Sequence, residues 1–219
     1  MTDWITTIKT HPSGVLLAAQ LVAVLAYPFT GDTPAGRAVL GVFGIFVLAV
    51  AVWAVRATPA LTWVAILLGI PVVVFTVLEG LYPGNGMIRL WSSVLHALFY
   101  GYTAYGLVRY LFDDTFVTRD EIFAVGANFT VVAWGFAYVF MAVQVVYPGS
   151  FVSFQGEGFQ NFPNLLFLSF ATLTSVGLSD ILPVLPHARS VALVEQVVGV
   201  LYVAMIISRV VSLTVLHRR

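Results

Sequence analysis

Residues 162–186, FPNLLFLSFATLTSVGLSDILPVLP, decide how the rest of this chain is interpreted. The first part, residues 162–173, is apolar but far shorter than the ~20 residues that a membrane-crossing helix needs. The polar part, residues 172–180, cannot be a lipid-exposed strand, because its backbone N–H and C=O groups would have no partners. Bare backbone survives at membrane depth only where protein surrounds it or where it lines a water-filled path. The segment therefore predicts a re-entrant half-helix followed by a loop that lines such a path.

The composition places the whole chain in a membrane. Hydrophobic residues make up 60% of its 219 residues and charged residues 9%, whereas about a quarter of the residues of a soluble domain are charged. The formal net charge is zero and basic residues form no runs, which speaks against nucleic acid as a partner. Cysteine is absent, which excludes disulfides and thiol chemistry.

Apolar stretches separated by turn residues predict an all-α membrane protein with six transmembrane helices. The re-entrant helix and its loop lie between the fifth and the sixth, and Asn161 and Pro163 suit the start of that short helix. The charged connector DDTFVTRDE, residues 113–121, divides the chain into a four-helix membrane domain, 1–114, and a second domain, 115–219. The predicted spans are 14–29, 38–55, 60–78, 88–112, 122–147 and 190–216.

The distribution of basic residues predicts the orientation. With six crossings and both termini in the cytoplasm, seven of the ten basic residues lie inside and three outside, in agreement with the positive-inside rule. We therefore expect a multi-pass protein of the cell (inner) membrane with both termini cytoplasmic. The three outside residues are Arg37, Arg89 and Arg189.

The motif TLTSVGLSDILP, residues 172–183, resembles the pore signature T-x-T-T-V-G-Y-G-D-x-x-P of the tetrameric potassium channel superfamily. The resemblance extends from VTRDEIF to the end of the last apolar segment. Over this region the chain resembles prokaryotic six-helix ion channel proteins. Two positions depart from the pattern: Leu178 replaces the family's aromatic residue and Ser179 its second glycine. The matching residues are Thr172, Thr174, Val176, Gly177, Asp180 and Pro183, with Ser175 in place of a threonine.

This resemblance implies a homotetramer that conducts monovalent cations passively. One chain supplies too few oxygen atoms to replace the water around an ion, whereas four copies of residues 174–178 around one axis would form stacked oxygen rings. Val176 and Gly177 would contribute carbonyl groups, and Thr174 and Ser175 hydroxyl groups. The negative end of the short helix would point toward the axis. The resemblance implies no cofactor and no metal site apart from permeant K⁺ or Na⁺.

The two departures leave the selectivity open. Carbonyl groups that all face one axis require some residues with positive φ, which glycine adopts easily and Ser179 does not. Leu178 can only pack where the family's tyrosine forms a hydrogen bond. We expect the inner sites to persist behind a remodelled outer mouth, and both a potassium channel and a weakly selective cation channel fit this. Asp180 would form a ring of four carboxylates at the mouth, or a local hydrogen bond that holds the outer turn.

Further positions each have two interpretations. Gly199 resembles the family's gating hinge, or it permits close helix packing. His96 is a candidate pH sensor, or it hydrogen-bonds to neighbouring helices. Glu195 braces the back of the filter or reaches water. Arg209 extends to the membrane interface, or it faces the pore. Strong voltage gating is not expected, because only Arg89 and Arg109 flank the fourth span.

Other functional classes have less support. The chain contains no motif of a known catalytic centre, so it is not expected to be an enzyme. A secondary transporter usually has paired broken helices in two related halves, and only one half of this chain carries an interruption. A non-conducting channel-like subunit is the third alternative. The expected partners are further copies of the chain, membrane lipids and a separate regulatory protein.

Overall fold

The structure is a computed structural model that describes residues 11–26, 28, 34–55, 60, 62–113, 119–154 and 158–216, with only the backbone at 34–42, 119 and 210–216. The predicted domain boundary at 114/115 lies outside these residues. In the described part the chain forms seven helices and two short strands. In chain order they are α2 (Pro12–Ala26), α3 (Pro34–Val55), α4 (Thr62–Leu81), α5 (Gly86–Leu111), α6 (Arg119–Val146), β1 (Phe151–Ser153), α7 (Phe162–Leu173), β2 (Ile181–Pro183) and α8 (Pro186–Leu216).

Each of the six predicted spans coincides with a helix, with ends displaced by a few residues. Three helices in the described part are long and apolar enough to cross a membrane, namely α4, α6 and α8. The apolar helical stretches in α2, α3 and α7 are shorter. The helical nature of the segments is therefore confirmed, and the total of six crossings stays a prediction.

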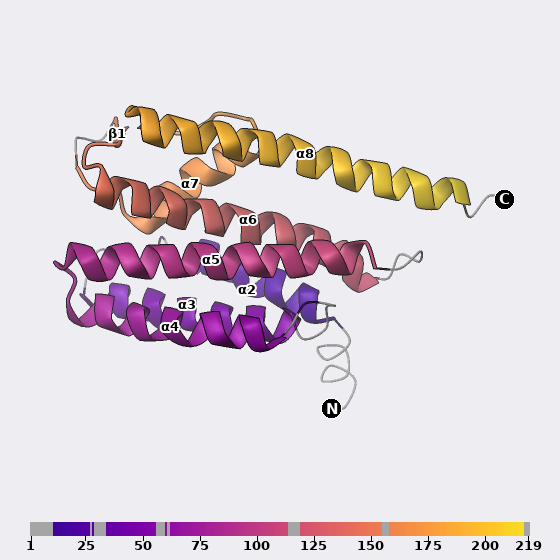
Figure 1. The fold of residues 1–219 in the computed structure, drawn as a ribbon, viewed down its shortest axis with the longest axis horizontal. Helices are drawn as coiled ribbons and strands as arrows, with labels where there is room; N and C mark the ends of the chain where they lie inside the picture. The colour runs from indigo at the N-terminus through magenta and orange to yellow at the C-terminus, as the bar shows by residue number, and fades with distance from the viewer. Residues whose placement is uncertain are drawn as a thin grey trace.

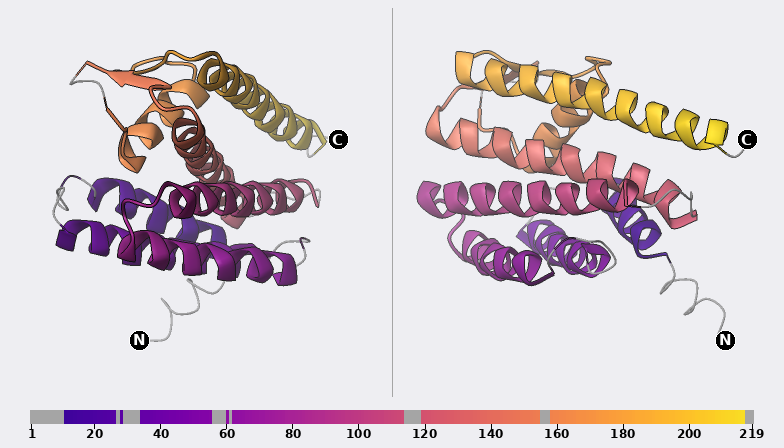
Figure 2. Two further views of the ribbon diagram at one scale, coloured as in Figure 1. Left: turned by 60° about the vertical axis from the view of Figure 1, so that its left-hand side comes forward. Right: turned by 45° about the vertical axis from the view of Figure 1, so that its right-hand side comes forward.

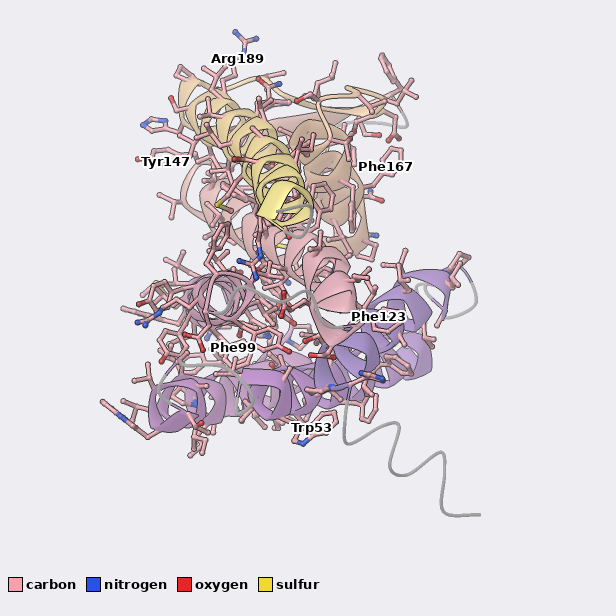
Figure 3. All side chains as sticks on the ribbon, turned by 90° about the vertical axis from the view of Figure 1, so that its right-hand side faces the viewer. Trp53, Phe99, Phe123, Tyr147, Phe167 and Arg189 are labelled. Carbon is pink, nitrogen blue, oxygen red and sulfur yellow. The ribbon has the colours of Figure 1, made fainter. Side chains whose placement is uncertain are left out.

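The helices are arranged in successive layers (Figure 1). Helices α2, α3 and α4 form one layer, α5 and α6 follow, and α8 lies on the far side with the short α7 between it and α6; the further views in Figure 2 agree. Figure 3 looks along the helices from the end where α8 finishes and shows Phe123 between α6 and α2. Phe99 lies at the contact of α5 with α4, against Gly69. The large buried side chains Phe99, Tyr100 and Phe140 form part of the core around α5 and α6.

Polar contacts join the helices at one end of the molecule. The Asp120 carboxylate at the start of α6 accepts hydrogen bonds from the backbone N–H and the hydroxyl of Ser13 at the start of α2. Next to it, Glu121 pairs with Arg209 in the C-terminal part of α8 at 3.0 Å. The start of α2 and the C-terminal part of α8 therefore lie at the same end of the molecule, as an even number of crossings requires.

A two-stranded sheet at the opposite end departs from the all-helical prediction. Strand β1 precedes α7, β2 follows the loop after α7, and they pair antiparallel with Phe151 opposite Pro183 and Ser153 opposite Ile181. The Val184 N–H extends the pairing by donating to the Ser150 carbonyl. The sheet thus closes the hairpin formed by α7 and its loop. Strands of three residues are too short to give a hydrophobic period, so the sequence could not indicate them.

Candidate functional site

The start of α7 is fixed as the sequence predicts. The Asn161 side chain accepts a hydrogen bond from the backbone N–H of Asn164, and Pro163 lies in the first turn. The carboxamide of Gln144 on α6 also forms hydrogen bonds with both the N–H and the C=O of the Gln160 backbone. It donates to the Gln160 carbonyl at 2.7 Å and accepts from the Gln160 N–H at 3.0 Å. Both glutamines are buried, so this pair fixes the entry to α7 inside the protein.

Removing the Gln144 carboxamide should destabilise the fold. We expect Gln144→Met to lower the free energy of unfolding by about 1–3 kcal/mol, because the buried N–H and C=O of Gln160 lose their partner. Thermal unfolding of the purified protein in detergent measures the effect. Gln196→Met is the control, since Gln196 is exposed on α8 and the same substitution there should leave the unfolding temperature unchanged. Equal unfolding temperatures for Gln144→Met and wild type would contradict this account.

The loop after α7, residues 174–180, is named the filter segment here. Its first residues remain attached to the helix: the Thr174 N–H and hydroxyl both donate to the Phe170 carbonyl, and the Ser175 N–H donates to the Thr172 carbonyl. The chain then turns at two residues with positive φ, Ser175 at 58° and Gly177 at 72°. A hydrogen bond from the Gly177 N–H to the Ala171 carbonyl holds this turn. The predicted short helix and the irregular stretch after it are therefore present, and their re-entry into a membrane stays a prediction.

The outer part of the filter segment is stabilised by local contacts. Among the described non-glycine residues only Ser175 has positive φ, so Ser179 does not adopt a glycine-like conformation. Its N–H donates to the Gly177 carbonyl, and its hydroxyl oxygen accepts from the Ile181 N–H. Asp180 accepts a hydrogen bond from the Ser153 hydroxyl at 3.3 Å, which corresponds to the local-bond alternative for this residue. The carboxylate ring stays a prediction.

The filter segment lies on the surface of the single chain. Residues 174–178 are exposed, with Val176 at 62% and Leu178 at 74% of their maximal area. A shallow groove runs between this segment and α8, lined by Ser175, Gly177, Gln196, Val197, Val200 and Leu201. The adjacent face of α8 exposes further apolar side chains, among them Leu193 and Val194. Bare backbone and an apolar helix face therefore share one side of the chain.

Behind the filter segment, α8 packs closely against the end of α7. A Cβ atom at Gly199 would overlap the Leu173 carbonyl oxygen and lie 2.8 Å from the carbonyl carbon. The close-packing interpretation of Gly199 is thus realised, and its role as a gating hinge stays a prediction. One helical turn earlier, the Oε1 atom of the fully buried Glu195 contacts the Ser169 hydroxyl of α7. Glu195 therefore contacts the back of α7 rather than water.

His96 is buried on α5, away from the filter segment. Its Nδ1 lies 2.8 Å from the Ser92 carbonyl oxygen, and its ring stacks on Tyr138 of α6 with the centroids 4.1 Å apart. Tyr138 in turn contacts Phe162 at the start of α7, 4.4 Å between centroids. Its Nε2 lies 3.4 Å from the Thr76 hydroxyl of α4. The interpretation that His96 hydrogen-bonds to a neighbouring helix is thus realised, and its role as a pH sensor stays a prediction.

Arg209 has partners within the chain. Its guanidinium pairs with Glu121 and lies over the Phe112 ring at 5.2 Å, and its side chain is 11% exposed. The carboxylate provides a charge-assisted partner, and the position of Arg209 relative to the membrane interface stays a prediction. In the described residues no cluster of three His, Asp or Glu side chains is placed to hold a metal ion.

Some of these contacts have a signal in the sequence. Ser169 is a hydroxyl residue within the apolar run of α7, and Glu195 is a single acid within an apolar helix. Isolated polar residues in such segments usually find a partner on a neighbouring helix. The Gln144–Gln160 pair has no comparable signal, because Gln160 belongs to an irregular loop.

The comparison with known families agrees with this geometry. Residues 127–215, which run from within α6 to the last turn of α8, match the ion channel family. No curated protein and no solved structure matches the chain significantly. The matched region contains α7, the filter segment and the Glu195 and Gly199 contacts of α8. The apolar helices therefore indicate a membrane protein whose residues 127–215 are similar to the ion channel family.

Proposed function

We propose that four copies of this chain assemble around the filter segment into a channel that conducts monovalent cations passively and discriminates weakly between potassium and sodium. The observation that carries the proposal is the exposed backbone of residues 174–178 at the end of a half-length helix. Inside a membrane such backbone needs water or further protein around it. A water-filled axis lined by several copies meets this need.

The surface of the single chain supports assembly. The groove beside the filter segment and the apolar face of α8 lie together, so one contact with a neighbouring copy would cover both. Rotational symmetry would then bring four filter segments to one axis and create rings of oxygen atoms. The C-terminal end of α7 would direct its partial negative charge toward the same axis. The oxygen rings and the negative end of α7 would both favour a cation over an anion.

The outer part of the filter segment supports weak selectivity. The Gly177 carbonyl already accepts a hydrogen bond from the Ser179 N–H, and the Ser179 hydroxyl is engaged with the Ile181 N–H. These bonds occupy outer polar groups within the segment. The inner positions, Thr174 to Gly177, would therefore supply the ion sites, while the mouth at Leu178 and Ser179 would be wider and wetter. Both termini would face the cytoplasm of a cell whose inner membrane holds the channel.

Ion flux into liposomes tests the proposal. The purified protein is reconstituted, and uptake is followed under a potassium gradient and under a sodium gradient. We expect comparable flux of both ions in wild type and a preference for potassium in the double variant Leu178→Tyr/Ser179→Gly, which restores the residues of the potassium channel signature. Flux of potassium alone in wild type would show that the outer mouth is selective as it stands.

Two other outcomes separate the remaining classes. Flux that requires a second solute gradient would identify a secondary transporter. An absence of flux with either ion, from protein shown to be tetrameric, would favour a non-conducting subunit and contradict the proposal. Chemical cross-linking in the liposomes gives the oligomeric state for both cases.

A further inference from the structure

Three helices meet at a buried polar contact behind the filter segment. The Ser169 hydroxyl of α7 lies 2.8 Å from the Ala133 carbonyl oxygen of α6 and also contacts the Oε1 atom of Glu195 on α8. All three residues have no exposed area in the single chain. Their burial therefore does not depend on neighbouring copies.

The hydrogen bonds at this contact require one more proton than an ionised carboxylate provides. A serine hydroxyl has one proton to donate, and a backbone carbonyl oxygen can only accept. If Ser169 donates to Ala133, its contact with Glu195 is a hydrogen bond only when Oε1 carries the proton. If Ser169 donates to Glu195 instead, no proton lies between its oxygen and the Ala133 carbonyl oxygen 2.8 Å away, so lone pairs of the two oxygens face each other. Both contacts are satisfied together only by a protonated Glu195.

The second carboxyl oxygen leads to the same conclusion. Oε2 of Glu195 is buried and has no hydrogen-bond partner in the described part of the chain. An ionised carboxylate spreads its charge over both oxygens, and burying one of them without a partner is costly. The neutral acid leaves only an uncharged carbonyl-type oxygen there, which is a much smaller cost.

The surrounding helices bring no cation to offset a negative charge. Helix α7 carries no ionisable side chain. The charged residues of α6, 119–121, lie at its far end, and its one other ionisable residue is Tyr138, which packs on His96 and Phe162. On α8, Arg189 donates to the Pro183 carbonyl and Arg209 pairs with Glu121. The other ionisable residues in the described part of α8 are His187, which stacks on Tyr147, and Tyr202, whose hydroxyl donates to the Val125 carbonyl.

We infer that Glu195 is held as a neutral carboxylic acid and that in this form it is a positioning residue for α7. Its proton goes to Ser169, and the proton of Ser169 goes to the Ala133 carbonyl, so that one chain of hydrogen bonds joins α8, α7 and α6. Ser169 and Leu173 lie one turn apart on α7, and Glu195 and Gly199 lie one turn apart on α8, so both contacts are on the facing sides of these helices. Together they fix the end of α7 from which the filter segment leaves.

Infrared spectroscopy tests the protonation state without any need for conduction. The difference spectrum between wild type and Glu195→Gln at neutral pH should contain the carbonyl band of a protonated carboxylic acid. Ser169→Ala should shift this band, because the acid loses its acceptor. Glu79→Gln is the matched control, since Glu79 is partly exposed and paired with Arg89, and its difference spectrum should contain no such band. A wild-type spectrum without the band would overturn the inference.

Ion flux tests the positioning role, which rests on the proposed function. The amide of Glu195→Gln can donate to Ser169 as the acid does, so this variant should keep flux and unfolding temperature near wild type. Glu195→Met cannot donate, and its flux should fall severalfold. Equal losses in Glu195→Gln and Glu195→Met would overturn the role of the donated proton. A wild type that conducts nothing would contradict the proposed function, while the infrared result would still decide the protonation state.

Discussion

Replacing Gly177 by Asp is expected to abolish ion flux. The side chain has room, because a Cβ atom at Gly177 would have no atom within 4 Å, and the strain at positive φ is smaller for Asp than for most non-glycine residues. The effect comes from charge: four carboxylates would surround the axis at one level. One unit charge 4 Å from a cation adds about 4 kcal/mol to its binding at an effective dielectric constant of about 20. Conduction requires weak binding, so an ion held that tightly leaves about a thousandfold more slowly.

Gly149 provides a control of the same kind. It lies in the loop between α6 and β1, has a positive φ of 80°, and a Cβ atom there would also have no atom within 4 Å. Gly149→Asp is thus the same substitution at a glycine that also has positive φ and open surroundings, but it lies outside the filter segment. Liposomes with this variant should retain potassium and sodium flux. Undiminished flux in Gly177→Asp would mean that the filter segment does not line the ion path.

Much of the pore region could be predicted because its signals are local. The short apolar run, the Asn161 cap and the turn residues after Thr172 each act over a few residues, and the structure places α7 at the predicted residues, Phe162–Leu173. The sequence also indicated that Ser179 would not adopt positive φ, since serine lacks the conformational freedom of glycine. Caps, turns and the length of an apolar run depend on neighbouring residues, so they can be predicted without knowing the tertiary structure.

The contacts that hold this region in place could not be predicted with the same certainty. Gln144 and Gln160 are brought together by the packing of a loop against α6, and the pairing of β1 with β2 joins residues about thirty positions apart. Arg209 and Glu121 are 88 residues apart, and only the fold places them within 3.0 Å. For Glu195 and Gly199 the sequence offered two interpretations each, and the choice depended on which face of α8 meets α7.

Gly199→Ala is expected to destabilise the protein as well as reduce flux. Helix α8 is continuous through Gly199, and a methyl group there would overlap the backbone carbonyl of Leu173, which has no side-chain freedom to move aside. Separating α8 from the end of α7 would cost about 3 kcal/mol, at the upper end of overpacking effects. Gly101→Ala on α5 is the control, because a Cβ atom there would have no atom within 4 Å, and alanine in an open helical position stabilises by about 0.5–1 kcal/mol.

The same pair of variants distinguishes packing from hinge bending at Gly199. Alanine favours a helix more than glycine does, so if Gly199 served only as a hinge, Gly199→Ala would stiffen α8 and change flux while the unfolding temperature stayed level or rose. If the glycine is needed for the close approach of α7, the unfolding temperature falls, and it falls even in detergent, where nothing is conducted. A lower unfolding temperature in Gly199→Ala beside an unchanged or higher one in Gly101→Ala would therefore assign the glycine to packing. Because the Leu173 carbonyl directly precedes the filter segment, the loss of flux would then follow from a displaced α7 and not from a rigid gate.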